Sequence, residues 1–245
     1  MVQHHLAEEI SMDSMTMRQT QVQVRVNSFV RSVYNWMGIG LALTGFVGYY
    51  VSTSENLIRL IFGNPLLLMV LIVVELGLVF GIAGMVNRMS AGTATALFVI
   101  YSALNGVTLS SIFLVYVQTS IVSTFFICAA TFIACSLYGW TTKKDLTSLG
   151  GFMMMGLIGI VIASLVNLFL QSSSVNAIIS YIGVFVFIGL TAYDTQKIKN
   201  MAMTQPANLD GAVIRKGAIL GALSLYLDFI NLFLMLLSIF GQRRD

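Results

Sequence analysis

The chain alternates between long apolar segments and short polar ones. Seven of the apolar segments are long enough to cross the roughly 30 Å hydrocarbon core of a bilayer as helices. They are continuous, whereas the strands of a membrane β-barrel alternate apolar and polar residues. The pattern therefore predicts an all-α integral membrane protein with seven transmembrane helices. The predicted spans are Val33–Val51, Pro65–Val86, Ala91–Val117, Ile121–Trp140, Leu149–Leu170, Val175–Asp194 and Ala212–Phe240.

The composition supports this class. Hydrophobic residues make up 57% of the 245 residues and charged residues only 9%, against roughly 25% charged in soluble domains. The net charge of +3 is small and dispersed, so we expect no nucleic-acid partner. Residues 1–30 are polar and lack the apolar core of a signal peptide. We predict a cytosolic N-terminal arm over residues 1–30 and one transmembrane domain over residues 31–245.

The basic residues predict the orientation. With the N-terminus inside, ten Lys and Arg residues lie on the cytoplasmic side and three lie outside, as the positive-inside rule requires. The tail would be cytosolic if the last segment turned back, but its length and lack of proline favour a full span. We therefore expect a multi-pass inner-membrane protein with a cytoplasmic N-terminus. The inner residues are Arg18, Arg25, Arg31, Arg88, Lys143, Lys144, Lys197, Lys199, Arg215 and Lys216, and the outer ones are Arg59, Arg243 and Arg244.

The sequence lacks the residues that some kinds of active site and metal site require. The only histidines, His4 and His5, lie in the arm, so the predicted spans offer no histidine for a Ser–His dyad or a His-ligated zinc inside the membrane. Three acids remain at membrane depth, namely Glu75, Asp194 and Asp228. A carboxylate there costs several kcal/mol unless it is protonated, paired or wetted, so each is a candidate functional residue.

The last predicted span carries small and polar residues on one helical face. Such a face packs closely against other helices, which places this helix at the centre of the bundle. Ser224 and Asn231 either join helices by hydrogen bonds or line a pore. Asp228 adds a charge that mere helix association does not need. The face comprises Gly217, Gly221, Ser224, Asp228, Asn231 and Ser238.

Asp194 ends the sixth predicted span, where the helix dipole disfavours a carboxylate. Arg88 ends the second span on the same side and is our candidate for its partner. Counted from the outer side, Asp194 lies roughly 28 Å deep and Asp228 roughly 22 Å deep, which permits contact. In contact, the two carboxyl groups would share one proton, because two like charges cannot both ionise in a low dielectric.

Two segments around these aspartates resemble those of the Bax inhibitor-1 (transmembrane Bax-inhibitor motif) family, most closely its bacterial inner-membrane branch. They are Gly189-Leu-Thr-Ala-Tyr-Asp-Thr-Gln-Lys-Ile and Leu223-Ser-Leu-Tyr-Leu-Asp-Phe-Ile-Asn-Leu-Phe. The resemblance extends to Tyr101-Ser-Ala-Leu-Asn-Gly-Val-Thr-Leu-Ser-Ser-Ile and Leu137-Tyr-Gly-Trp-Thr-Thr-Lys-Lys-Asp-Leu, and it covers nearly the whole chain.

This resemblance implies seven helices with a central last helix, and a pH-sensitive calcium leak gated by two aspartates. Asp194 and Asp228 match that pair and would provide the oxygen ligands for Ca²⁺. Arg88 matches a family arginine that holds the aspartate pair in the closed state, and Glu75 matches a family acidic residue that lines the pore. The partners would be Ca²⁺, protons and the lipid bilayer, with no cofactor and no enzymatic activity.

Two other functions stay open. Bacterial relatives include a protein that restrains a membrane-anchored AAA protease through its N-terminal arm, so this chain could be a stress-related regulator. Two aspartates on late helices also resemble those of intramembrane aspartyl proteases. Those enzymes carry Gly-x-Gly-Asp at the second site, where this chain has Leu225-Tyr-Leu-Asp, which makes the protease function the weakest of the three.

Overall fold

The computed structural model describes the backbone of residues 2–204, 206 and 209–244, and within these ranges the side chains of residue 20 and of residues 22 onward. The regular secondary structure of that part is helical, and its only β pairing is an isolated bridge between Tyr116 and Arg243. The elements, in order, are α1 (Val2–Ser52), α2 (Glu55–Phe62), α3 (Pro65–Met85), η1 (Val86–Arg88), α4 (Ala91–Leu109), α5 (Ile112–Val115), α6 (Gln118–Thr141), α7 (Thr147–Leu170), α8 (Ser173–Thr204) and α9 (Gly211–Phe240).

Six helical segments of the described chain are long and apolar enough to cross a membrane. The prediction of an all-helical membrane protein is confirmed, and the predicted number of seven spans is not. The first predicted span, residues 33–51, lies in α1 and falls outside this set because polar residues such as Asn35 and Thr44 interrupt its apolar pattern. The six segments are Pro65–Arg88, Ala91–Val115, Gln118–Thr141, Thr147–Leu170, Ser173–Thr204 and Gly211–Phe240.

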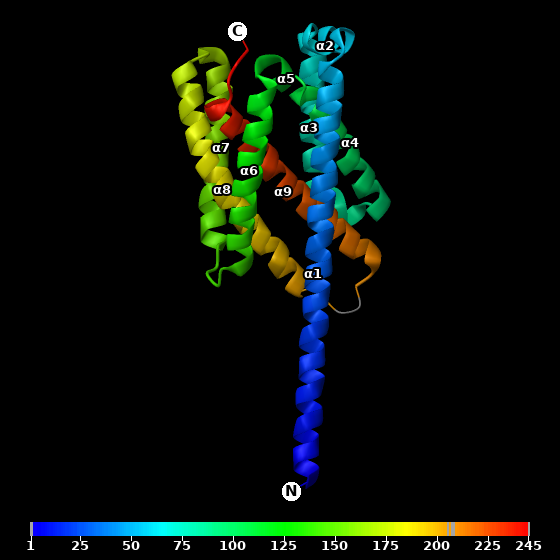
Figure 1. The fold of residues 1–245 in the computed structure, drawn as a ribbon. Coiled ribbons are helices and arrows are strands. Elements are labelled where there is room, and N and C mark those ends of the chain that lie inside the picture. Colours follow the sequence, from blue (N-terminus) through cyan, green and yellow to red (C-terminus); the bar gives the residue numbers. More distant parts are fainter. Residues whose placement is uncertain (1, 205, 207–208, 245) are drawn as a thin grey trace.

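Helix α1 is continuous through the boundary that we predicted at residue 30. Its first part projects beyond the other helices and its second part runs beside them (Figure 1). The predicted arm and the predicted first span therefore belong to one helix. The side chains of residues 1–19 and 21, which include His4, His5 and Arg18, lie outside the described residues.

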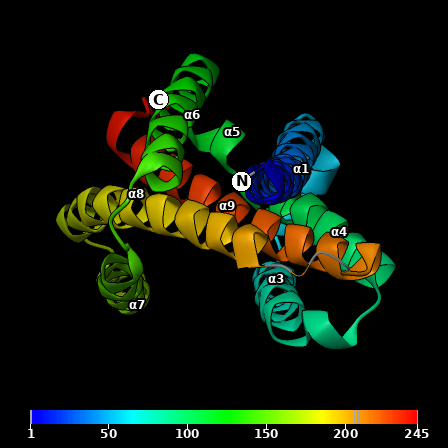
Figure 2. The ribbon, with the colours of Figure 1, turned by 90° about the horizontal axis from the view of Figure 1, so that it is seen from below.

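Helix α9 occupies the middle of the bundle. It packs against α1, α3, α4, α6 and α8 and crosses between them obliquely (Figures 1 and 2). Small residues permit this packing, since Ala218 and Ala222 are fully buried and Gly221 lies against Val33 and Ile198. The helix runs from one end of the bundle to the other and is long and apolar enough for the full crossing that we predicted for the last segment.

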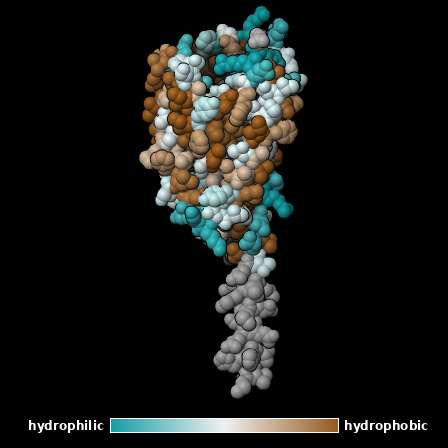
Figure 3. Space-filling view, turned by 60° about the vertical axis from the view of Figure 1, so that its left-hand side comes forward, coloured by the Kyte–Doolittle hydropathy of each residue, from teal (hydrophilic) through white to brown (hydrophobic). Residues whose placement is uncertain are grey.

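The two ends of the bundle differ in charge. One end holds the α6–α7 loop, the end of α8, the start of α9 and η1, and we call it the basic end (lower end in Figure 1). An apolar surface separates the polar surfaces of the two ends (Figure 3). The basic end carries Arg25, Arg31, Arg88, Lys143, Lys144, Lys197, Lys199, Arg215 and Lys216, whereas Arg59, Arg243 and Arg244 lie at the other end.

Candidate functional site between α8 and α9

The structure brings Asp194 and Asp228 to one interface. Asp194 lies on α8 and Asp228 on α9, two helices that pack along their length. Their carboxyl groups are close enough for the charge of one to act on the other. The Ser224 hydroxyl, one turn before Asp228 on α9, lies beside the Asp194 carboxyl group. The three side chains therefore form one polar site inside an apolar bundle.

Asp228 is the more deeply placed of the two acids. Only 5% of its surface is exposed, and its Oδ2 atom has no hydrogen-bond partner among the described residues. Buried carboxylate oxygens nearly always accept a hydrogen bond, so an orphaned one is unusual and calls for an explanation. Asp194 is half-buried and connects this interior site to the more open part of α8.

Asp194 does not lie at a helix end, contrary to our prediction. We predicted that its helix ends at this residue, whereas α8 continues to Thr204. Asp194 therefore lies inside a helix, where the partial negative charge of the helix C-terminus has little effect on its carboxyl group. Its charged neighbour is Lys197, one turn further along α8, and the Lys197 Nζ atom also lies 5.9 Å from the centre of the Tyr193 ring.

Arg88 lies apart from this arrangement. It ends η1, its side chain is exposed, and it makes no ion pair within the described part of the chain. Its role as a latch therefore stays a prediction.

The other predicted pore residues occupy different surroundings. Glu75, on α3, is half-buried and accepts a hydrogen bond from the Thr108 hydroxyl of α4. Asn231, one turn after Asp228, donates its side-chain amide to the Leu227 carbonyl of its own helix over 2.8 Å. Glu75 thus belongs to the α3–α4 side of the bundle, and Asn231 stays close to the aspartate pair along α9.

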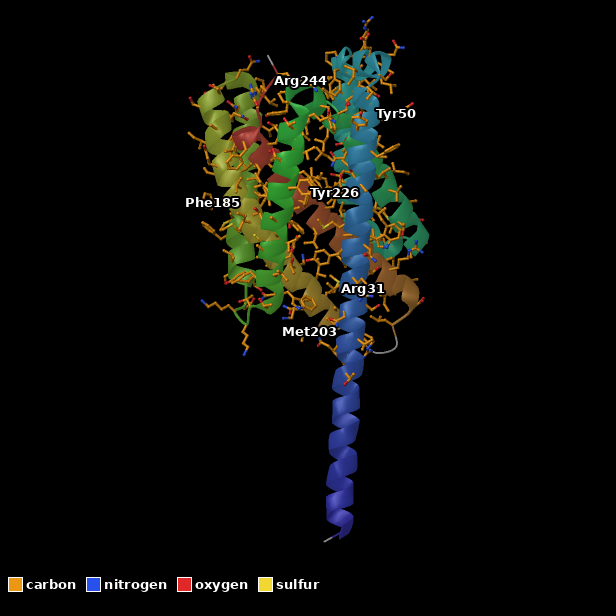
Figure 4. All side chains as sticks on the ribbon, viewed as in Figure 1. Arg31, Tyr50, Phe185, Met203, Tyr226 and Arg244 are labelled. Atoms are coloured by element: carbon orange, nitrogen blue, oxygen red, sulfur yellow. The ribbon has the colours of Figure 1, made fainter. Side chains whose placement is uncertain are left out.

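A second polar cluster, which we did not predict from the sequence, lies on the α1 and α4 side of α9. The Tyr226 hydroxyl lies 2.7 Å from the Thr44 hydroxyl of α1 and accepts a hydrogen bond from the Asn105 amide of α4 over 2.9 Å. The Thr44 hydroxyl also lies 2.7 Å from the Ser102 carbonyl oxygen. Tyr226 is fully buried and points into the bundle (Figure 4). Polar residues inside apolar spans were the available signal, but their partners could not be read from the sequence.

The α6–α7 loop holds α8 in place beside Asp194. Gln196 accepts a hydrogen bond from the Leu146 amide and donates one to the Lys144 carbonyl, each over 2.8 Å. In the same loop, Asp145 accepts hydrogen bonds from the backbone amide and hydroxyl of Thr147 over 2.9 and 2.6 Å. These bonds stabilise the charged form and lower the pKa of Asp145 below its usual value.

Close helix contacts fix the same stretch of α8. A Cβ atom on Gly139 of α6 would lie 2.2 Å from the Ala192 carbonyl oxygen, and one on Gly150 of α7 would lie 2.4 Å from the Tyr193 ring. Thr195, next to Asp194, donates to the Ser136 hydroxyl of α6 over 3.3 Å. The backbone that carries Asp194 is therefore clamped by α6 and α7.

The described residues do not form a complete resident metal site. No cluster of three or more His, Cys, Asp or Glu side chains occurs among them. Ca²⁺ usually takes six to eight oxygen ligands, and the site offers two carboxylates with the Ser224 hydroxyl beside them. This donor set is smaller than the coordination that a tightly held Ca²⁺ needs.

A bundle of apolar helices around a central helix, with a carboxylate pair at its core, defines a multi-pass α-helical membrane protein. Residues 26–245 match the family described as "Inhibitor of apoptosis-promoting Bax1", and the chain belongs to this Bax inhibitor-1 family. The resemblance noted from the sequence is thereby confirmed.

Bacterial relatives match over nearly their whole length. "Inner membrane protein YbhL" of Escherichia coli strain K12 is 53% identical over 224 residues, which cover 91% of this chain and 95% of the relative. An uncharacterized protein of Borreliella burgdorferi is 47% identical over 96% of this chain and 100% of its own length. One from Deinococcus radiodurans is 42% identical over 96% of this chain and 99% of its own length.

Proposed function

We propose that this protein is a pH-sensitive Ca²⁺ leak channel in which Asp194 and Asp228 form the gate. The observation that carries the proposal is the buried Asp228 oxygen without a hydrogen-bond partner in the described chain, beside a second carboxyl group. Nothing in helix packing requires a charge there, since an amide would join the helices equally well.

The gate would work through the proton that the two acids share. Two adjacent carboxylates in a low dielectric cannot both be charged at low cost, so one proton is retained between them. Loss of that proton exposes hard oxygen ligands of the kind that Ca²⁺ prefers. The Ser224 hydroxyl would orient Asp194, Glu75 and Asn231 would line the path, and Arg88 would act as a latch in a closed state.

The membrane topology belongs to this proposal. The name of the Escherichia coli relative places that protein in the inner membrane, and we propose the same location here. The excess of basic residues at one end supports a cytoplasmic basic end. We also propose α1 as the seventh span, because it runs beside the bundle and the two termini lie at opposite ends of the molecule (Figure 1).

Calcium entry into proteoliposomes between about pH 6 and pH 8 tests the gate. Asp194→Asn and Asp228→Asn should each abolish the pH dependence of the flux. Asp210→Asn is the matched control, since Asp210 is an exposed acid that caps α9 at the basic end and Asn caps a helix equally well. Flux that keeps its wild-type pH dependence in both gate variants would refute the proposal.

The projecting part of α1 favours a second function. It extends beyond the other helices (Figure 1) and is accessible to a partner at the membrane surface. We propose that a membrane-anchored AAA protease could bind there, with the protein acting as its regulator. Deletion of residues 2–19 should then change the turnover of that protease's substrates while Ca²⁺ flux is unaffected. Unchanged turnover would exclude this role.

A further inference from the structure

A pocket of about 480 Å³ lies at the basic end, where α1 meets the end of α8 and the start of α9. We call it the basic pocket. Its wall on α1 consists of Val22, Arg25, Ser28, Phe29, Ser32 and Trp36, and Arg215 lines it from α9. In Figure 4 the labelled Met203, which also lines it, lies at this end of α8. The described residues around the pocket include no Asp or Glu.

The α1 wall is a single helical face. Val22, Arg25, Ser28, Ser32 and Trp36 follow one another at intervals of three and four, which places them in a row along one side of the helix, with Phe29 next to Ser28. Phe29 is buried and anchors this face on the bundle. Ser28 and Ser32 lie along the row and contribute hydroxyl groups.

Trp36 holds Arg215 at the edge of the pocket. The guanidinium carbon of Arg215 lies 5.7 Å from the centre of the Trp36 ring, a cation–π arrangement. Arg215 is the fifth residue of the α9 span that begins at Gly211. It therefore lies about 6 Å along the helix from the end of the span, at the level of lipid headgroups.

The nearest acid in sequence is already engaged. Asp210 precedes α9 and accepts a hydrogen bond from the Ala212 amide over 3.1 Å, which caps the helix. Its carboxylate is directed to the backbone of α9, and it therefore leaves the positive charge of Arg215 at the pocket.

We propose that the basic pocket binds the phosphate group of an anionic phospholipid. The planar guanidinium groups of Arg25 and Arg215 match phosphate oxygens in pairs, and the Ser28 and Ser32 hydroxyls can donate to them. Basic pockets between helices at the membrane surface are a known binding mode for such headgroups. The acyl chains would lie along the apolar part of the wall. This inference does not depend on the channel function.

The fluorescence of Trp36 can report binding in the basic pocket. The chain has two tryptophans, so Trp140→Phe leaves Trp36 as the only one. Titration of this variant in detergent with short-chain phosphatidylglycerol should change its fluorescence, and phosphatidylcholine at the same concentration should not. Adding Arg25→Gln should weaken phosphatidylglycerol binding about tenfold, as expected for the loss of one charge-assisted contact. Lys143→Gln removes an equal charge from the α6–α7 loop at the same end and should leave binding unchanged.

Equal binding in the Arg25→Gln and Lys143→Gln proteins would overturn the proposal, because it would show general attraction to the basic end. A variant with both Ser28→Ala and Ser32→Ala keeps every charge and should still bind several-fold more weakly; it decides the question if the arginine variant fails to fold. Glycerol 3-phosphate separates the two sources of phosphate. Displacement of the lipid by millimolar glycerol 3-phosphate would assign the pocket to soluble phosphate esters and overturn the lipid assignment, whereas retention of the lipid would support it.

Discussion

The hydroxyl groups of Tyr226 and Thr44 lie 2.7 Å apart and join α9 to α1, two residues along α9 from Asp228. On this side of α9 the polar groups are satisfied by one another, since Tyr226 also accepts from Asn105. The Asp228 Oδ2 atom, in contrast, has no such partner in the described chain. One helix thus carries a structural polar cluster and a candidate functional one, and different measurements should tell them apart.

Tyr226→Phe should destabilise the protein by about 1–2 kcal/mol, because it leaves Thr44 and Asn105 without their shared partner in the interior. The edge-to-face contacts of the ring with Phe98 and Tyr101 remain possible for Phe. Thermal unfolding in detergent measures the effect. Tyr138→Phe, which removes an exposed hydroxyl, is the control and should unfold like the wild type; equal midpoints for both variants would contradict the structural role.

Asp228→Asn should unfold at the same temperature as the wild type near pH 7, or at a higher one. A buried ionisable group without a hydrogen bond is costly, and an amide removes the possibility of a buried charge. The thermal midpoint of the purified variant checks this. A clear fall in the midpoint would mean that Asp228 is retained for stability, and would remove the main support for its role as a gate.

Gly139→Ala should destabilise the packing of α6 on α8 by about 1–3 kcal/mol, the usual cost of overpacking. The new Cβ atom would meet the backbone carbonyl of Ala192, which cannot move without shifting the helix that carries Asp194. Gly151→Ala is the matched control, since nothing lies within 4 Å of its Cβ position. The control should be neutral or slightly stabilising, because Ala favours a helix more than Gly does. Similar thermal midpoints for the two variants would contradict the predicted contact.

Asp145 should make stability depend on pH at the acidic side. Its hydrogen bonds from Thr147 lower its pKa from the ordinary 3.8. Because the pKa of Asp145 is lower in the folded protein than in the unfolded one, the ionised carboxylate stabilises the fold at pH values above the unfolded-state pKa. This stabilisation is lost as the pH falls through the lower, folded-state pKa. Asp145→Asn keeps an acceptor oxygen but cannot titrate. The wild type should therefore lose more stability than the variant between pH 7 and pH 3, as measured by thermal unfolding. Parallel losses would exclude this contribution.

Much of the fold could be predicted because it depends on local properties. Six of the seven predicted spans reappear as helices that could cross a membrane, since length and apolar content decide that property. The spans of residues 175–194 and 33–51 were less accurate, because α8 and α1 continue well beyond them as polar helix. Helix formation does not stop where hydrophobicity does, so an apolar pattern finds the membrane-crossing part and leaves the helix ends undetermined.

The sequence by itself determined the class of protein, the basic end, the three acids at membrane depth and the family. Only the tertiary structure decided that Ser224 lies beside Asp194, that Tyr226 pairs with Thr44 and Asn105, and that Arg215 lies over the Trp36 ring. The physical reason is that these partners lie on different helices. A helix that can be apolar on every side in lipid carries little periodic signal for its rotation and tilt. Packing against its neighbours sets both, and thereby selects which polar side chains meet.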